Sequence, residues 1–340
     1  MPDSPAARTS PRSTKLVICV WHKFNLWRPP ESLTEILRSR WPQMKIIHLS
    51  NYDMLPAEIA DTDIFVGYSI RPEQFAMARQ LKWIHSTATG IGQLMFPALR
   101  ESGVTVTNAR GVHSVPVAEH VMSLVLAMAR RLPDAVGFQL QSHWGQQEIW
   151  GANVPPRELH GSVLLLIGFG AIGQEVARRA EAFGMTIHAV TRSGHGDTTL
   201  AKKLFAQEQL VEALREADFV ILAAPETPKT THMIGPHELA AMKHTAYLVN
   251  VARGTLIDEP ALMEALAREI IAGAALDVTE REPLPPESPL WQVKNLLITP
   301  HVAGVTEHLW ERQGALLAEN LERWFTGREL LNQVELSRGY

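Results

Sequence analysis

Short apolar runs alternate along the chain with segments whose apolar residues recur at helical spacing. In the first third, runs rich in β-branched and aromatic residues predict five strands, at 15–21, 44–49, 63–68, 81–86 and 104–108. Helical segments near 31–41 and 72–80 lie between some of them. Because strands that alternate with helices form parallel sheets through right-handed crossovers, this part of the chain predicts an α/β domain.

A second series of apolar runs follows a polar, Pro- and Gly-punctuated connection over 141–161. It predicts six further strands, at 162–167, 185–190, 217–224, 245–251, 271–278 and 295–300. A long apolar helix lies between the two series, with Ser114 as its expected cap, Pro116 in its first turn and Pro133 at its end. A last helix is expected at about 305–325. Since 340 residues suit about two domains, the two series predict two α/β domains.

The composition argues against several classes of binding partner and cellular compartment. The net charge is only −4, which argues against a nucleic-acid partner. Cys19 is the one cysteine, so no disulfide can form within the chain, and a cytoplasmic location is expected. No apolar run approaches the ~20 residues that a membrane span needs, so no membrane partner is expected. Residues 1–14 are rich in Pro, Ser and Ala and lack the apolar core of a signal peptide, which predicts a disordered tail.

The strand that ends at Ile167 runs into Gly168-Phe169-Gly170-Ala171-Ile172-Gly173, a G-x-G-x-x-G pattern that opens a helix. In this setting Gly168 permits a tight turn, Gly170 lets the backbone approach a pyrophosphate, and Gly173 lets helix and strand pack closely. Free N–H groups at the helix N-terminus then face the phosphates. A plain turn between strand and helix is the alternative. The context favours a dinucleotide site.

The next strand ends in Thr191-Arg192-Ser193, where NAD-binding chains usually place Asp or Glu. An acid there accepts hydrogen bonds from the adenosine ribose and repels a 2′-phosphate. A guanidinium and a hydroxyl can instead donate to that phosphate. We therefore expect NADP(H) to be preferred, with NAD(H) possible. Stacking of Arg192 on the adenine, or a solvent position, is the alternative, and a ribose role for Asp197 farther along the loop stays open.

Polar residues also follow three later strands: Arg253 after 245–251, Asp277 and Glu282 after 271–278, and His301 after 295–300. Ligands in open α/β sheets bind outside the carboxyl ends of the strands, so these side chains can converge.

Their chemistry suits reduction of a ketone. A hydride delivered to a carbonyl leaves an alkoxide, and His301 is suited to protonate it near neutral pH. Glu282 could orient the imidazole and favour its charged form, and Arg253 could hold a substrate carboxylate. Taken singly, the three residues could be a core histidine, a solvated charge and a surface ion pair. Their coincidence behind a dinucleotide turn favours catalysis.

At these residues the sequence resembles the D-isomer-specific 2-hydroxyacid dehydrogenase family. The resemblance lies in LLLIGFGAIGQEVA, LVNVARGTLIDEPAL, GAALDVTEREPLPPESPLW and NLLITPHVAGVT, and in the helix NARGVHSVPVAEHVMSLVLAMAR. It extends from about Lys15 over nearly the whole chain. It implies two Rossmann-like domains, each with a parallel sheet flanked by helices. The substrate domain would be 15–107 plus 302–340, with an NAD(P)-binding domain, 108–301, inserted in it.

The resemblance also implies roles for single residues. Arg253 would bind substrate, Glu282 would pair with the acid–base His301, and Asp277 would contact the nicotinamide carboxamide. Members similar to this chain are usually homodimers built through the cofactor domain. The expected cofactor site comprises Gly168, Gly170, Ala171, Ile172, Gly173, Arg192, Ser193, Ala223, Ala224, Pro225, Thr230, Val251, Ala252 and Asp277.

The segment STATGIGQL occupies the place of the family's carboxylate-binding loop, so Gly90 and Ile91 would offer backbone N–H groups to the substrate. Gly92 stands where an Asp is common, and a plain loop is the alternative. Tyr68, at a strand end, would face the same cleft or lie at the edge of the core. His113 departs from the family's usual apolar residue and is interpreted as structural, with a place near the nicotinamide as the less favoured alternative.

Two tryptophans in the connection, Trp144 and Trp150, are interpreted as core residues. Reaching over a neighbouring subunit's active site is the alternative. The 14 histidines are scattered and form no H-E-x-x-H or Cys/His cluster, so no metal is expected.

Together these features predict an NADPH-preferring reductase of small 2-oxo acids, of the glyoxylate or hydroxypyruvate class. An NAD-linked dehydrogenase of another acid, such as phosphoglycerate, formate or phosphite, is the alternative within enzymes. A dinucleotide-dependent, corepressor-like binding protein is the alternative outside them, because such proteins can retain the same three residues.

Overall fold

The computed structural model describes residues 13–196 and 198–336. The chain forms two compact units: unit 1 runs to Val112 and resumes at Thr306, and unit 2 is His113–Val305. The domain boundaries predicted from the sequence, after residues 107 and 301, lie slightly earlier in the chain than these unit boundaries. Most of the expected tail, residues 1–12, lies outside the described residues, as does Asp197.

Unit 1 contains a five-stranded parallel sheet in the order β2-β1-β3-β4-β5. Its strands are β1 (Lys15–Cys19), β2 (Lys45–Leu49), β3 (Ile64–Gly67), β4 (Trp83–Ser86) and β5 (Thr105–Thr107). Its helices are α1 (Glu31–Arg40), α2 (Leu55–Glu58), α3 (Pro72–Met77), α4 (Pro97–Arg100) and α12 (Leu309–Thr326). Every strand expected in this part of the chain is present.

The centre of this sheet is buried on both faces. Leu16 and Ile18 of β1 enter one apolar cluster, which includes Leu317 of α12, whereas Val17 and Cys19 enter another. Successive side chains of a strand point to opposite faces. A run that is apolar throughout, such as β1, therefore needs cover on both sides, as parallel sheets have.

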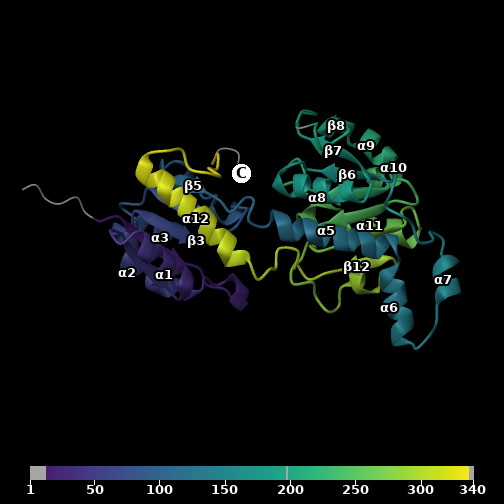
Figure 1. Ribbon diagram of the computed structural model, residues 1–340, viewed down its shortest axis with the longest axis horizontal. Coiled ribbons are helices and arrows are strands. Elements are labelled where there is room, and N and C mark those ends of the chain that lie inside the picture. Colours follow the sequence, from purple (N-terminus) through teal and green to yellow (C-terminus); the bar gives the residue numbers. More distant parts are fainter. Residues whose placement is uncertain (1–12, 197, 337–340) are drawn as a thin grey trace, which may run out of the picture. The chain divides into compact units, whose positions relative to one another are not determined.

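Unit 2 contains a seven-stranded parallel sheet in the order β12-β11-β10-β9-β6-β7-β8. Figure 1 shows β8, β7 and β6 toward one end of this unit and β12 toward the other. The strands are β6 (Val163–Ile167), β7 (Thr186–Thr191), β8 (Lys203–Ala206), β9 (Phe219–Leu222), β10 (Tyr247–Asn250), β11 (Gly273–Leu276) and β12 (Leu296–Ile298). Two Rossmann-like α/β folds are thus confirmed.

Helices cover both faces of this second sheet. One apolar cluster joins the sheet to α5 (Ser114–Ala129) and α8 (Ala171–Ala182), and the other joins it to α9 (Leu210–Glu216), α10 (Pro236–Ala241) and α11 (Glu259–Ala267). Alternate residues of β6 divide between the two clusters. This arrangement leaves the carboxyl ends of the strands as the edge from which loops emerge.

Three local predictions were wrong. The sequence missed β8, because Lys203–Ala206 is a short segment that begins with an exposed lysine and so carries little apolar signal. Pro133 does not end α5. It lies in the first turn of a new helix, α6 (Leu132–Leu140), after a left-handed Arg131. The expected connection also contains α7 (Gln146–Trp150).

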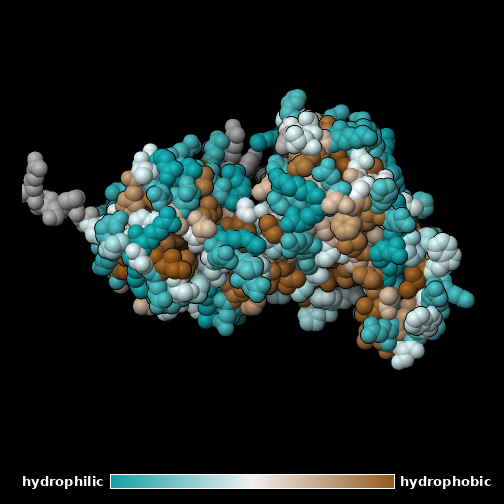
Figure 2. Space-filling view, viewed as in Figure 1, coloured by the Kyte–Doolittle hydropathy of each residue, from teal (hydrophilic) through white to brown (hydrophobic). Residues whose placement is uncertain are grey.

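Helices α6 and α7 form an arm that leads away from the sheet of unit 2 (Figure 1). Trp144 and Trp150 are 87% and 73% exposed, so the interpretation of these tryptophans as core residues was wrong. Leu132, Val136 and Leu140 are also exposed, and their spacing of four residues places them on one face of α6. Figure 2 shows hydrophobic surface over this part of the unit. The arm therefore presents an apolar stripe.

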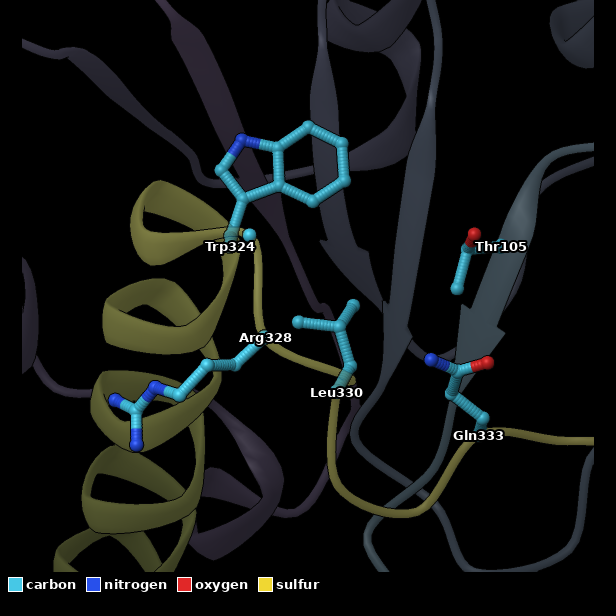
Figure 3. A pocket seen from close by; sticks show the side chains of 6 residues that line it. Thr105, Trp324, Arg328, Leu330 and Gln333 are labelled. Carbon is cyan, nitrogen blue, oxygen red and sulfur yellow. The ribbon is translucent and has the colours of Figure 1, made fainter.

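A shallow cavity of about 300 Å³ lies in unit 1, between the end of α12 and β5 (Figure 3). Trp324, Arg328, Leu330 and Gln333 are among the residues that line it, and the Arg328 guanidinium points away from Gln333. None of the residues predicted for catalysis or binding lines this cavity. We therefore assign it no part in the reaction.

Candidate active site

The predicted cofactor and catalytic residues of unit 2 follow the carboxyl ends of its strands in a definite spatial order. His301 follows β12, Asp277 and Glu282 follow β11, and Arg253 follows β10. Beyond β9, the glycine turn follows β6 and Arg192 follows β7. All these strands are parallel, so the residues lie along one edge of a single sheet. The predicted acid–base residue and the predicted phosphate-binding turn thus occupy different stretches of that edge.

His301 and Glu282 form the central ion pair, with 2.6 Å between the imidazole Nδ1 and the carboxylate Oε2. The hydrogen bond with Glu282 raises the pKa of His301 against the opposing effect of burial, and the charges of Glu282 and Asp277 add to the rise. Burial acts to raise the pKa of Glu282, but His301, the Thr279 amide and the charge of Arg253 together outweigh it, and the net pKa is lowered. The pair therefore favours a protonated imidazole beside an ionised carboxylate.

The backbone at His301 adopts φ 52°, a left-handed conformation that is uncommon for any residue other than glycine. Its N–H donates to the carbonyl oxygens of Asp277 and Thr299, at 2.9 and 3.0 Å. The Asp277 carboxylate accepts from the next two amides, of Val302 and Ala303, at 3.0 and 2.9 Å. A single buried aspartate thus holds the turn that aims the imidazole.

Arg253 belongs to a loop that leaves β10. The buried Asn250 brackets this loop, because its side chain donates to the Arg253 carbonyl at 2.8 Å and accepts from the Ala252 amide at 3.0 Å. A Cβ on Gly254 would stand 1.9 Å from the backbone of Thr279. The Arg253 loop and the loop that carries Glu282 are therefore in close contact. The charge of Arg253 acts on both members of the ion pair.

The glycine turn fits a dinucleotide. Gly168 has φ 100°, and a Cβ there would meet the Ala223–Ala224 peptide at 2.7 Å. A Cβ on Gly173 would lie 2.4 Å from the Gly168 carbonyl oxygen. At Gly170, the residue that precedes α8, a Cβ would meet nothing within 4 Å. Two glycines therefore serve the turn itself, and the third leaves open space at a helix N-terminus, where a phosphate can approach.

Arg192 and Ser193 follow β7 and are exposed. Ser193 forms an isolated antiparallel bridge with Ala206 at the end of β8, and Gly194 has φ 72°. The Thr191 hydroxyl donates to the His195 carbonyl at 3.0 Å. The strand that the sequence missed thus borders the loop that was predicted to select the cofactor.

The remaining predicted cofactor residues differ in what they expose. Ala223, Ala224 and Ala252 are half-buried and Pro225 is exposed, whereas the Val251 side chain enters the core. The Thr230 hydroxyl lies inside its own loop, where it donates to the Pro225 carbonyl at 2.8 Å and accepts from the Thr227 amide at 2.8 Å. Ala171 and Ile172 form the first turn of α8.

In unit 1, the loop after β4 is fixed through its carbonyl groups. The buried Gln313 of α12 donates to the Thr87 carbonyl at 2.7 Å, and Asn108 donates to the Thr89 carbonyl at 2.8 Å. Gln93 donates to the Tyr68 carbonyl at 2.8 Å and so ties the loop after β4 to the end of β3. Gly90 is exposed and the Ile91 side chain is buried, which leaves the loop's backbone at the carboxyl edge of the sheet.

The Tyr68 side chain is 50% exposed, which is compatible both with a place facing the substrate and with a place at the edge of the core. His113 precedes α5 and packs against Gly304, which lies three residues after His301. A Cβ added to Gly304 would be 3.0 Å from the His113 Nδ1.

The sequence missed three residues that shape the site: His120, Asn250 and Thr299. The available signal was weak, because His120 is one of several polar residues in α5, Asn250 ends an apolar strand and Thr299 follows one.

Within the described residues, no group of three or more His, Cys, Asp or Glu side chains is placed to hold a metal ion. Among those same residues, none of the helices has both the length and the apolar character that a membrane crossing requires.

Comparisons with known proteins agree with this geometry. The family model described as "D-isomer specific 2-hydroxyacid dehydrogenase, NAD binding domain" matches residues 122–303. A glyoxylate reductase of Thermococcus gammatolerans is 36% identical over 304 residues, which cover 86% of this chain and 89% of that protein. A D-3-phosphoglycerate dehydrogenase of Methanocaldococcus jannaschii is 36% identical over 282 residues, 82% of this chain; the chain spans 53% of that longer protein.

The same family appears among solved structures. A D-isomer specific 2-hydroxyacid dehydrogenase from Xanthobacter autotrophicus, solved in complex with NADPH and MES, has a TM-score of 0.82 and 27% identity. The match covers 97% of this chain and all of that one. The family resemblance and the expectation of an oxidoreductase that uses a nicotinamide dinucleotide are confirmed. The chain belongs to the D-isomer specific 2-hydroxyacid dehydrogenase family.

Proposed function

We propose that this protein reduces small 2-oxo acids, of the glyoxylate or hydroxypyruvate class, with NADPH as the preferred reductant. The observation that carries the proposal is the order of groups along one sheet edge. The acid–base pair lies at β11 and β12, the phosphate turn at β6 and a guanidinium at β7. An extended dinucleotide laid along that edge would reach from the His301 end to Arg192. Unit 2 would then be the cofactor domain and unit 1 the substrate domain.

When bound, the cofactor supplies a hydride to the carbonyl carbon of the substrate. His301 donates the proton that the resulting alkoxide requires, and it takes a proton back in the oxidation direction. Glu282 keeps the imidazole charged and oriented for that transfer. Arg253 binds the substrate carboxylate and polarises the carbonyl. In unit 1, the backbone amides of Gly90 and Ile91 are the groups that we assign to substrate binding.

Two of the predicted cofactor contacts act through the protein instead. The Asp277 carboxylate is 1% exposed and takes its hydrogen bonds from the His301 turn and Thr299, so its contribution to the nicotinamide end is the placement of that turn. Thr230 likewise closes the loop after β9. Backbone groups of Ala223, Ala224, Pro225, Val251 and Ala252 would line the dinucleotide.

The preference for NADP(H) rests on Arg192 and Ser193. Both are exposed at the end of β7, where a carboxylate would otherwise bind the ribose. The Xanthobacter relative was solved with NADPH, which agrees with this choice. The substrate class is supported by relatives named glyoxylate reductase. The phosphoglycerate dehydrogenase relative supports an NAD-linked enzyme for another acid as the second candidate.

We further propose a homodimer formed through unit 2. Its support is the apolar stripe of Leu132, Val136 and Leu140 on α6, together with Trp144 and Trp150 on the same arm. Apolar surface of this extent on a projecting element is typical of a surface that another chain covers. A second copy of the chain satisfies this by symmetry, because each arm can bury the other's stripe.

The test is His301→Ala, assayed by NADPH consumption with glyoxylate and hydroxypyruvate. Loss of the general acid is expected to lower kcat by about 10²–10⁴-fold. His232→Ala is the matched control, since His232 is another exposed histidine of unit 2 paired with a glutamate at 2.8 Å. Turnover of His301→Ala equal to the unmodified protein would contradict the proposed role. A matrix of kcat/KM for NADH and NADPH against glyoxylate, hydroxypyruvate, pyruvate and a bulky 2-oxo acid tests cofactor and substrate together.

A further inference from the structure

His120, a polar residue of the largely apolar helix α5, contacts two residues that support the His301 turn. His120 is half-buried, and its Nε2 lies 3.0 Å from the Thr299 hydroxyl and 3.4 Å from the Asp277 carboxylate. Thr299 follows β12 and Asp277 follows β11. These three side chains therefore link α5 to the ends of two adjacent strands that come much later in the sequence.

The hydrogen bonds fix which atom carries each proton. The Thr299 hydroxyl donates to Asp277 Oδ1 at 2.6 Å. A hydroxyl has one proton to donate, so Thr299 can only accept from His120. His120 Nε2 therefore carries hydrogen and starts a chain of donors that runs from α5 through Thr299 to the Asp277 carboxylate.

That carboxylate is buried, with the Asp277 side chain 1% exposed. Burial alone would raise the pKa of Asp277, but donors from His120, Thr299, Ala303 and Val302 outweigh it and lower the pKa, so the group is ionised. An ionised, buried carboxylate that loses a donor is destabilised, and its remaining contacts must shift. The contacts that remain are the amides of the His301 turn.

We propose that His120 is a positioning residue for the reaction, which acts through Thr299 and Asp277 to hold His301 in its left-handed turn against Glu282. The proposal rests on the proposed function of His301 as the acid–base group. In this proposal, proton transfer depends on the hydrogen-bond chain that starts at His120 as well as on the ion pair of His301 and Glu282. A small displacement of a reacting group can cost about 10²-fold in rate, so the effect of losing the chain is measurable.

The experiment compares His120→Leu, which removes the donor, with His120→Gln, whose side-chain amide can donate from a similar distance. His120→Leu is expected to lower kcat by about 10- to 100-fold with little change in the NADPH Kd, and His120→Gln to recover part of the loss. Thr299→Val removes the middle of the chain without touching α5. The double variant His120→Leu with Thr299→Val should lose no more than the worse single variant, because both changes break one chain.

A second readout separates positioning from mere stability. If the turn loosens, the contact between His301 and Glu282 weakens and the pKa of His301 falls toward its ordinary value. Reduction needs the protonated imidazole, so the alkaline limb of kcat should move to lower pH in His120→Leu. Ser123→Ala is the control, because Ser123 lies on the same helix and its hydroxyl donates only to the His120 carbonyl, at 2.7 Å.

Three results would overturn the proposal. One is a folded His120→Leu variant with unchanged kcat and an unchanged alkaline limb. Another is a double variant whose losses multiply. The third, which applies even where His120→Leu does not fold, is a folded Thr299→Val variant with unchanged kcat and pH profile. His301→Ala in the same assays distinguishes the failures: if it loses activity while His120→Leu and Thr299→Val do not, the proposed function stands and this inference falls.

Discussion

The two ends of the sheet edge in unit 2 are built differently. At the β12 end, His301 is held by a 2.6 Å ion pair, two backbone acceptors and a buried aspartate. At the β7 end, Arg192 and Ser193 lie exposed on a loop that borders the short edge strand β8. Proton transfer depends on sub-ångström placement, whereas recognition of a phosphate depends mainly on charge and reach. The buried hydrogen bonds thus lie at the end of the edge to which we assign proton transfer.

This contrast predicts different consequences of substitution. Changes at the β12 end should lower kcat with either cofactor and leave the dissociation constants nearly unchanged. Changes at the β7 end should alter the affinity for one cofactor and leave the chemical step intact. The glycine turn at β6 lies between them and should affect both cofactors equally. Each of the following variants tests one part of this comparison.

Glu282→Gln should have the largest effect of the three. It keeps an oxygen near His301 but removes the charge that raises the imidazole pKa. We expect kcat for reduction at neutral pH to fall about 100-fold or more, since the orienting carboxylate of an acid–base histidine has effects of this order. The folded-state pKa of His301 is raised above about 6.5 and should fall toward it. Because reduction needs the protonated form, the alkaline limb of kcat should shift to lower pH.

The control is Glu280→Gln, which removes a neighbouring glutamate that pairs with His232 at 2.8 Å. It should leave kcat and its pH dependence unchanged. An equal loss in both variants would show that the general negative charge of this loop matters, and not the contact with His301. An unchanged pH profile in Glu282→Gln would remove Glu282 from the proton-transfer step.

Gly170→Ala should have an intermediate effect, confined to cofactor binding. A Cβ there meets nothing within 4 Å in the protein, so the thermal midpoint should not change. It does project into the space that the pyrophosphate is proposed to occupy, and we expect both NADPH and NADH to bind at least about 30-fold more weakly. The measurement is a fluorescence titration with each cofactor.

Gly173→Ala is the matched contrast within the same turn. Its Cβ would lie 2.4 Å from a backbone oxygen, so this variant should lose stability by about 1–3 kcal/mol, as overpacked sites do. If Gly170→Ala binds both cofactors normally, the dinucleotide does not pass the glycine turn. The order of groups along the sheet edge would then no longer support the proposed function.

How much the sequence could predict also differs between the two ends. Long apolar runs precede the four residues predicted for the β12 end, which are Arg253, Asp277, Glu282 and His301. The convergence of these side chains could therefore be inferred from the topology of a parallel sheet alone. The role of Asp277 as the anchor of the His301 turn could not, because it depends on a left-handed backbone conformation and on donors from α5 and β12.

Elements set by tertiary packing were the harder ones. β8 is recognisable only as a neighbour of β7, since four residues that begin with an exposed lysine resemble a loop. Pro133 carries the same signal whether it ends one helix or starts the next, and the left-handed Arg131 before it decides the matter. We predicted core positions for Trp144 and Trp150 because large apolar residues are usually buried. Both lie on an arm that projects from the unit, so their side chains are exposed.

Arg192→Ala should have the smallest and most selective effect. The guanidinium is exposed, so its bond to a phosphate is screened and is expected to be worth about 1.4 kcal/mol, or roughly tenfold in the Kd of NADPH. The Kd of NADH and the kcat at saturating NADPH should not change. Arg178→Ala, another exposed arginine of unit 2, should alter neither cofactor. Equal weakening of both cofactors in Arg192→Ala would mean that Arg192 stacks on the adenine. In that case the β7 end would not distinguish the cofactors, while the hydride-transfer chemistry assigned to the β12 end would be untouched.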